Sequence, residues 1–311
     1  MGRIVFINPH PKGLISGGVK TVYRQVELLN ELGLEAYVFQ ADGQADWLES
    51  SARVLTTPQP APSSDEILVF PENPQGWLAD MAQTPMAAQK VLFCQAQYYT
   101  YHSTIPVERL PAIGYSRIAC VSEIAKGFLE RVLHLKDVAV IPCFIDENVF
   151  FPRRKAMQIA FLPHKLPREL AIIHRIFTSK YPHLRSIPWH AIEQKSEAAT
   201  AELLGQSTIY LSLPFLESLG LVPLEAMSSG CIVVGFHGYG GLEYASSENG
   251  FWFAPDYLEE VADALARVVT GIERDESSLA AMREAGLATA RQFNRERTRG
   301  ALSSFYGSMV R

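Results

Sequence analysis

Two glutamates stand eight positions apart in the apolar stretch LPFLESLGLVPLEAMSSG, which covers residues 213–230. Glu225 lies among leucine, alanine and methionine, where a carboxylate needs donors to compensate for its burial. A vicinal diol such as that of a ribose offers two hydroxyl donors, and one carboxylate can accept both. Glu217 could take hydroxyls from a second sugar, and the N–H groups between the two glutamates could hold a diphosphate. The stretch therefore has parts suited to a nucleotide diphosphate sugar.

The elements around this stretch decide whether the two carboxylates can meet a ligand. A predicted strand over 208–213 precedes Glu217, and a predicted helix over 221–229 contains Glu225. Ligands of parallel sheets bind at the carboxyl ends of the strands, which is where this turn would lie. Gly220 lets backbone approach a ligand because it has no β-carbon. The bare spacing also permits a plainer interpretation, in which Glu217 faces solvent and Glu225 pairs with a lysine or arginine.

Short apolar runs alternate with segments of helical period along the whole chain, which indicates βα units around parallel sheets. The predicted strands cover residues 3–7, 35–40, 67–70, 91–94, 117–121, 158–162, 189–192, 208–213 and 231–235. The predicted helices cover residues 19–32, 168–177, 198–204, 221–229, a segment that Ser122 caps and that runs to about Leu133, and most of the chain after Leu258. The expected fold class is α/β, with two doubly wound Rossmann-like domains facing each other across a cleft.

A domain edge is predicted where the apolar run from Val138 to Ile145 gives way to the charged segment DENVFFPRRK and to Pro152. We therefore expect an N-terminal domain over 1–148 and a second domain over 149–293. Residues 294–311 are predicted to form a terminal helix. This helix either belongs to the second domain or crosses back to the first.

The charge balance excludes several classes of partner. The chain has 311 residues, 28 of them Lys or Arg and 33 Asp or Glu, for a formal net charge of -5. The basic residues are split 11 and 17 about residue 150, so neither half carries the basic excess of a nucleic-acid-binding domain. No apolar run approaches the roughly 18 residues that span a bilayer, and the first residues do not read as a signal peptide. The four cysteines are widely spaced, as expected of reduced thiols. We expect a cytoplasmic protein, with membrane contact at most peripheral, at the inner face.

Residues 211–243 resemble the signature of the retaining glycosyltransferases of family 4, which have the GT-B fold. That signature runs from a strand to a glutamate, a glycine-bearing turn, a second glutamate in "EAM", an apolar strand and a paired-glycine loop ending in glutamate. The matching positions are Glu217, Gly220, Leu221, Glu225, Ala226, Met227, Gly230, Val233, Val234, Gly240, Gly241 and Glu243. Weaker similarities cover SGGVKTVYRQVELLNELG (the amino-terminal glycine loop and first helix), VIPCFIDENVFFP (the inter-domain linker) and SENGFWF.

The resemblance implies a role for each matched residue. Glu225 would bind the ribose diol and Glu217 the hydroxyls of the donor sugar. The backbone from Ser218 through Leu219 and Gly220 to Leu221 would hold the sugar and the phosphates. Gly17 and Gly18 would approach the distal phosphate from the first domain.

The match departs from the family pattern at the diphosphate. The family places an arginine and a lysine after the first strand of the second domain, where this chain reads IAFLPHKLPREL. Lys165 fits the lysine, and we assign it with Glu217 to catalysis, although a solvated surface lysine is the alternative. His164 stands where the arginine is often found, and Arg168 could substitute from the first helical turn. Each charge-assisted bond to the diphosphate adds about 1.5–3 kcal/mol, so one missing cation would weaken the reaction without abolishing it.

The acceptor side is less defined in the sequence. Many family members carry a first-domain histidine near the anomeric carbon, and no position of this chain matches it uniquely. Gln95 and His102 follow the strand KVLFC and are the candidates for that side of the site. The tyrosines of QYYTYH either stack on a sugar or pack at the domain edge.

The function that the resemblance implies is retaining transfer of a sugar from a UDP- or GDP-type donor to an acceptor hydroxyl. The acceptor would be a saccharide or lipid-linked, as in polysaccharide or glycolipid biosynthesis. No D-x-D motif occurs, so no metal or other cofactor is expected. Because no base is evident, the leaving phosphate would help to deprotonate the acceptor. A non-catalytic nucleotide-sugar-binding partner of the same fold is the alternative that His164 leaves open. A nicotinamide dehydrogenase is disfavoured, because ISGGVKTV is not G-x-G-x-x-G.

Overall fold

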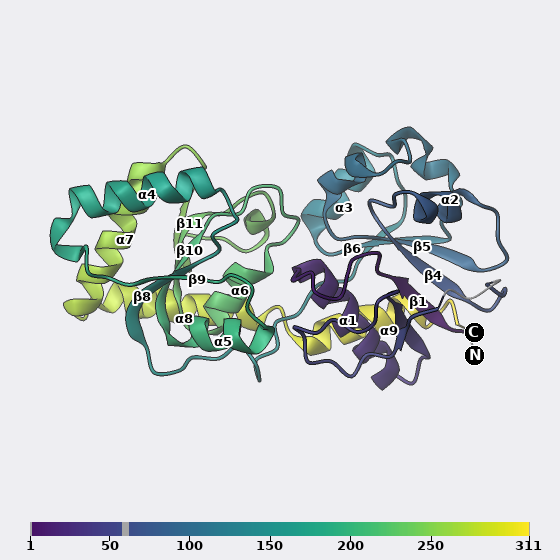
Figure 1. Ribbon diagram of the computed structural model, residues 1–311, viewed down its shortest axis with the longest axis horizontal. Coiled ribbons are helices and arrows are strands. Elements are labelled where there is room, and N and C mark those ends of the chain that lie inside the picture. Colours follow the sequence, from purple (N-terminus) through teal and green to yellow (C-terminus); the bar gives the residue numbers. More distant parts are fainter. Residues whose placement is uncertain (1, 58–61, 311) are drawn as a thin grey trace. The chain divides into compact units, whose positions relative to one another are not determined.

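The protein folds into two compact units in the computed structural model, which describes residues 2–57 and 62–310 (Figure 1). The first unit comprises the chain up to Cys143 together with the chain from Arg295 onward. The second unit runs from Phe144 to Asn294. The sequence placed the first boundary at 148/149, five residues later than the structure.

A seven-stranded parallel sheet forms the centre of the first unit, in the order β3-β2-β1-β4-β5-β6-β7. The strands are β1 (Ile4–Ile7), β2 (Ala36–Phe39), β3 (Val54–Leu55), β4 (Ile67–Pro71), β5 (Gln89–Cys94), β6 (Arg117–Cys120) and β7 (Val138–Val140). Most of their residues are buried and apolar, as is typical of parallel strands covered on both faces. Because all the strand pairs are parallel, the carboxyl ends of the seven strands lie at one edge of the sheet.

Helices cover both faces of this sheet. They are α1 (Gly17–Glu31), α2 (Trp77–Gln83), α3 (Glu123–Arg131) and α9 (Arg295–Tyr306), with 3₁₀ turns η1 (Gln97–His102) and η2 (Val107–Ala112). The apolar residues of α2 and α3 pack on one face, and α1 and α9 lie together on the other (Figure 1). On that second face Phe6 contacts Phe93 and Tyr306, with ring centroids 6.2 and 6.0 Å away. The terminal helix α9 is therefore part of the first unit's core.

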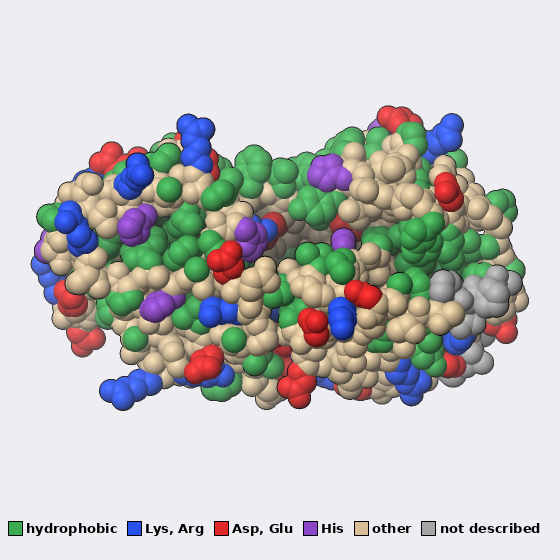
Figure 2. Space-filling model, in the orientation of Figure 1, with side chains coloured by type: hydrophobic (Ala, Val, Ile, Leu, Met, Phe, Trp, Pro, Cys, Tyr) green, Lys and Arg blue, Asp and Glu red, His purple; other side chains and the backbone are tan. Residues whose placement is uncertain are grey.

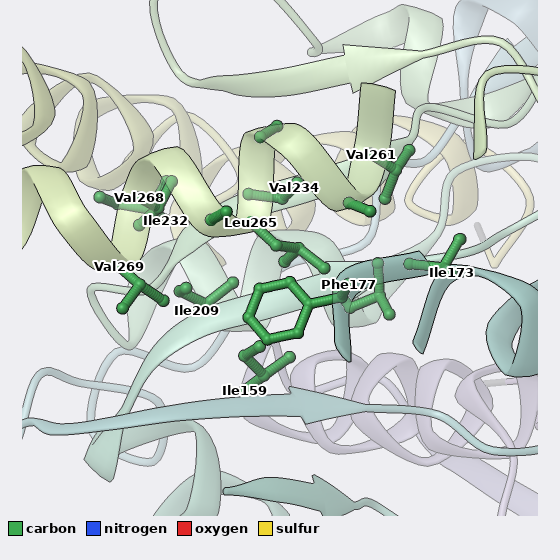
Figure 3. Close-up of a cluster of buried hydrophobic side chains, with 14 of the residues drawn as sticks. Ile159, Ile173, Phe177, Ile209, Ile232, Val234, Val261, Leu265, Val268 and Val269 are labelled. Atoms are coloured by element: carbon green, nitrogen blue, oxygen red, sulfur yellow. The ribbon is translucent and has the colours of Figure 1, made fainter. Parts of the chain in front are cut away.

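The second unit has a five-stranded parallel sheet in the order β12-β11-β10-β8-β9. Its elements are β8 (Ala156–Phe161), α4 (Pro167–Lys180), η3 (Pro182–Leu184), β9 (Trp189–Ala191), α5 (Glu197–Gln206), β10 (Ser207–Ser212), α6 (Leu221–Ser228), β11 (Ile232–Phe236), η4 (Gly240–Glu243), β12 (Gly250–Phe253), α7 (Leu258–Glu273) and α8 (Ser277–Arg291). Helices α4 and α7 cover one face, and α5, α6 and α8 cover the other. Figure 3 shows Phe177 of α4 and Leu265 of α7 directed at the aliphatic side chains of the strands, including Ile159 and Ile209.

The predicted α/β class with two Rossmann-like domains is confirmed, and the predicted strands and helices occur within a few residues of their expected bounds. Ser122 caps α3 by accepting a hydrogen bond from the Ala125 N–H. Gly33 follows α1 with φ +78°, the left-handed conformation that glycine adopts at a helix end. The sequence missed α2 and β3, which are short, and did not assign β7 within the apolar run at the domain edge.

The surface agrees with the near balance of charge. Figure 2 shows acidic and basic side chains scattered over the visible face, and the described residues form no continuous basic surface on that face. Cys94, Cys120, Cys143 and Cys231 are buried and free of disulfides. Among the described residues, no helix combines the length and the apolar character needed to cross a membrane.

Candidate active site

The topology of the second unit brings two loops together at the carboxyl edge of its sheet. Strands β8 and β10 are parallel neighbours, with Phe161 opposite Leu211. The loop after β8 carries Lys165 and the loop after β10 carries Glu217, so residues 52 positions apart come side by side. The Lys165 ammonium forms an ion pair with the Glu217 carboxylate. Both side chains keep about a third of their surface exposed, at 34% and 30%, and a polar ligand can reach them.

The turn from Glu217 into α6 depends on Gly220. Gly220 is the N-cap of α6 and has φ +79°, a conformation that is strained for residues with a β-carbon. A β-carbon at this position would lie 3.2 Å from Glu217 Oε2 and 3.3 Å from the Tyr244 hydroxyl oxygen. The Tyr244 hydroxyl donates a hydrogen bond of 3.1 Å to the Gly220 carbonyl. The glycine therefore lets the glutamate carboxylate and a buried tyrosine converge on the start of the helix.

The paired-glycine loop after β11 supports the same turn from the other side. A β-carbon at Gly240 would clash with the backbone of Ser218 and Leu219. Only glycine allows η4 to approach the Glu217 loop this closely. The paired glycines of the sequence signature thus shape the loop that carries the glutamate.

Glu225 lies in the second turn of α6 and is only 2% exposed. Tyr210 of β10 lies near both glutamates. Burial raises the pKa of the Tyr210 phenol well above its usual value, and the charges of Glu217 and Glu225 add to that rise. Ser218 and Leu219 are buried at the start of the turn, and Leu221 is half-buried at the start of α6. The two glutamates predicted to bind the donor therefore both lie near Tyr210, and their role stays a prediction.

The cations around this edge differ in what they can contribute. His164 is exposed beside Lys165, and partial desolvation, together with the Lys165 charge, lowers the pKa of its imidazole below 6.5. Glu217 and Glu193 oppose that shift without reversing it. This downward shift of the pKa favours the neutral imidazole at pH 7, so His164 supplies less positive charge than an arginine would. Arg168 is exposed in the first turn of α4.

In the first unit, Gly17 and Gly18 open α1, and the Ser16 side chain caps that helix by accepting a 3.2 Å hydrogen bond from the Gly18 N–H. Gln95 follows β5 at the same sheet edge. A β-carbon on Gly18 would lie 3.5 Å from Gln95 Nε2, so the amide of Gln95 stands beside the start of α1. The sequence-predicted Gly18 and Gln95 are thus brought together.

His102 ends the 3₁₀ turn η1 and is exposed. Its ring stacks on Tyr99, with centroids 5.2 Å apart and an interplanar angle of 21°. Tyr98 and Tyr101 both make edge contacts with Phe128 of α3. Two of the three tyrosines therefore pack against α3, and Tyr99 remains the one paired with the candidate histidine.

One residue of the first unit's edge was missed from the sequence. Glu72 follows β4 directly and is 5% exposed. Its carboxylate accepts hydrogen bonds from the Gln95 N–H at 3.2 Å and from the Ala96 N–H at 2.9 Å. Burial raises the pKa of this carboxyl to about 7. A glutamate immediately after an apolar strand run, in LVFPEN, was the available signal.

The described residues contain no group of three or more His, Cys, Asp or Glu side chains arranged to hold a metal ion. The metal independence expected from the sequence stays a prediction.

Comparisons with known proteins agree with this geometry. A family model described as "Glycosyl transferases group 1" matches residues 189–287, which contain both glutamates and the paired-glycine loop. A protein named alpha-1,6-glucosyltransferase from Actinobacillus pleuropneumoniae serotype 7 is 26% identical over 270 residues, covering 82% of each chain.

Solved structures share the whole fold at low identity. A glycosyltransferase from Rickettsia africae ESF-5 has a TM-score of 0.74 and 14% identity, covering 100% of this chain and 99% of its own. Anabaena HepE, solved with UDP-glucose, has a TM-score of 0.70 and 16% identity, covering 99% of this chain and 100% of its own. The structural likenesses show that the chain has the GT-B fold, and the family match over residues 189–287 together with the homologue supports a glycosyltransferase enzyme.

Proposed function

We propose that the protein transfers a sugar from a UDP-type nucleotide donor to a saccharide hydroxyl with retention of anomeric configuration. The observation that carries this proposal is the cluster at the second unit's sheet edge. There the Lys165–Glu217 ion pair lies beside the glycine-opened N-terminus of α6. A cation and free helix N–H groups suit a diphosphate, and a carboxylate suits sugar hydroxyls.

Each residue then has a role in binding the donor. Glu225, buried in α6, accepts hydrogen bonds from the ribose diol. Glu217 accepts hydrogen bonds from hydroxyls of the transferred sugar. Lys165 and the backbone from Ser218 to Leu221 stabilise the negative charge of the diphosphate. When the donor arrives, Lys165 exchanges part of its contact with Glu217 for a contact with phosphate.

The reaction breaks the bond between the anomeric carbon and the phosphate oxygen and forms a bond to the acceptor oxygen. The acceptor proton passes to the leaving diphosphate oxygen, so atoms and charge balance without a separate base. Charge develops on the diphosphate as the bond breaks. Preorganised donors at that position lower the barrier because they need no reorganisation during the step. In this proposal Lys165 and the N–H groups at the start of α6 are those donors.

The identity of the donor and acceptor draws support from the relatives. The Actinobacillus protein is named a glucosyltransferase that forms α-1,6 linkages, and the HepE structure contains UDP-glucose. UDP-glucose is accordingly the first donor to test, and a glucoside with a free primary hydroxyl is the first acceptor. Such a reaction would extend a saccharide, as in polysaccharide or glycolipid biosynthesis. The protein would work in the cytoplasm, with contact at most peripheral with the inner membrane face.

The test is release of nucleotide from a panel of UDP- and GDP-sugars, with and without methyl glucoside, by the purified protein. We expect release of UDP from UDP-glucose that rises with acceptor, and a product whose new linkage is α by NMR. Glu217→Gln should abolish most of this turnover. Product with the opposite anomeric configuration would refute retention, and absence of turnover with every donor would refute the transferase assignment.

A further inference from the structure

Two buried glutamates flank β4 at its opposite ends. Glu66 precedes the strand and is 4% exposed, and Glu72 follows it and is 5% exposed. Glu66 pairs with Arg3 and accepts a hydrogen bond of 2.9 Å from the Ser63 N–H, at the amino edge of the sheet. Glu72 lies at the carboxyl edge, where ligands of parallel sheets bind. The two residues flank the same strand and are similarly buried, but only Glu72 is at the carboxyl edge of the sheet.

Glu72 holds the turn that follows the neighbouring strand β5. One carboxylate oxygen accepts from the Gln95 N–H and the other from the Ala96 N–H. Two adjacent backbone donors on two oxygens fix the direction in which the chain leaves β5. The Gln95 side chain then reaches the start of α1, where a β-carbon on Gly18 would lie 3.5 Å from Gln95 Nε2, at ordinary contact distance.

We propose that Glu72 is a positioning residue of the transfer reaction, which holds Gln95 at the N-terminus of α1 so that the Gln95 amide binds a hydroxyl of the saccharide acceptor. The inference rests on the proposed function, since it assumes that a saccharide reaches this edge. An amide both donates and accepts, and it can therefore bind a neutral hydroxyl in either direction.

The chemistry of the contact requires a carboxylate at position 72. Replacing one oxygen by an NH₂ group would set a donor against a backbone N–H, which leaves both without an acceptor. Protonation of the carboxyl weakens the contact made by one of its oxygens, because an O–H oxygen is a poorer acceptor than a carboxylate oxygen. Burial raises the pKa of Glu72 to about 7. The ionised carboxylate, which holds the turn after β5, and the neutral carboxyl, which holds it less firmly, therefore interconvert near neutral pH. Burial raises the pKa of the Cys94 thiol on β5 well above 9, the Glu72 charge adds to that rise, and this thiol stays neutral near pH 7.

The experiment compares wild type with Glu72→Gln, Gln95→Ala, the double variant and the matched control Glu66→Gln. Nucleotide release from UDP-glucose is measured against methyl glucoside concentration, and UDP binding is measured by calorimetry. We expect both single variants to lower kcat/KM for the acceptor roughly tenfold to hundredfold, as misplacement of a binding group does. The double variant should be no worse than Glu72→Gln. If Glu72 acts only by holding Gln95 in place, both changes remove the same contact with the acceptor. UDP affinity should stay within about threefold, and Glu66→Gln should match wild type in kinetics.

The pH profile gives a second readout that general loss of structure would not reproduce. Wild-type kcat/KM for the acceptor should rise with pH through an ionisation near 7. The Glu72→Gln variant should not show this rise. Additive losses in the double variant, unchanged kinetics in Gln95→Ala, or the same rise in Glu72→Gln would overturn the inference.

The failure of the inference is distinguishable from failure of the proposed function. If Glu217→Gln abolishes turnover while Glu72→Gln behaves like Glu66→Gln, Glu72 has no positioning role and the transferase assignment stands. If the wild type turns over none of the donors, the proposed function fails and the inference fails with it.

Discussion

The ligand edges of the two units are built from different chemistry. At the second unit's edge a lysine and a glutamate form a partly exposed ion pair, beside a loop whose close packing depends on Gly220 and Gly240. At the first unit's edge the neutral amide of Gln95 lies beside the start of α1, and the buried carboxylate of Glu72 accepts hydrogen bonds from two backbone N–H groups. An exposed ion pair can exchange partners with a charged ligand, whereas an amide can bind a neutral hydroxyl in either direction. In the proposed reaction the same kind of sheet edge thus serves a charged donor in one unit and a neutral acceptor in the other.

Removing the buried glutamate of the second unit should have the largest effect. Glu225→Ala is expected to lower kcat/KM by about 2–4 kcal/mol, the loss of one or two buried charge-assisted hydrogen bonds to the donor. Steady-state kinetics with UDP-glucose measure this loss. Glu202→Ala, on the exposed face of α5, is the matched control and should stay within about twofold of wild type. Wild-type turnover in Glu225→Ala would contradict the assignment of the second unit's edge as the donor site.

The inward carboxylate of the first unit should make stability depend on pH. The pKa of Glu72 is about 7 in the folded protein and about 4.5 unfolded, so the folded state retains the proton longer. The folded state is therefore favoured most below pH 4.5, where the carboxyl is neutral in both states, and it loses stability as the pH rises to about 7, because ionising the buried group is unfavourable. That shift corresponds to about 3 kcal/mol. Chemical unfolding of wild type and Glu72→Gln at several pH values measures the difference. A variant that keeps the wild-type pH dependence would show that another group causes it.

Glycine packing at the second edge should give an intermediate effect. Gly240→Ala places a methyl group against the backbone of Ser218 and Leu219, and we expect a loss of about 1–3 kcal/mol in unfolding free energy. Catalytic activity should fall with it, because the Glu217 loop must shift. Gly300→Ala in α9 has open space at that position and should stabilise its helix by about 0.5–1 kcal/mol. Equal effects of the two changes in thermal unfolding would contradict the close packing of η4 on the loop.

The smallest effect is expected from metal removal. If Lys165 and the α6 N-terminus stabilise the diphosphate, treatment with EDTA should leave kcat/KM of the purified enzyme unchanged. Loss of activity with EDTA and its return with Mg²⁺ or Mn²⁺ would show that a cation shares that task.

Much of the fold could be predicted because its signals are local. Buried parallel strands appear as apolar runs, Gly33 ends α1, and Ser122 caps α3. The glutamate segment was also predictable, since its spacing lies within one stretch of chain. Even there, the reason for Gly240 emerged only from the structure, because the backbone it meets lies more than twenty residues earlier.

The rest depends on contacts between segments distant in sequence. Lys165 meets Glu217 because β8 and β10 are neighbours in the sheet, and Glu72 meets Gln95 because β4 and β5 are neighbours. The order of the strands in each sheet therefore determines which of these residues meet, and no local sequence pattern predicts that order. The short helix α2 was missed for a related reason, since seven residues carry too little periodicity to identify a helix.

The most direct test of the account is a crystal structure of the protein with UDP bound. We predict that the ribose hydroxyls lie about 3 Å from the Glu225 carboxylate, with the diphosphate beside Lys165 and the N–H groups from Gly220 to Leu221. A structure with the nucleotide bound elsewhere, and with Glu217 and Glu225 not in contact with it, would contradict the assignment of this edge as the donor site.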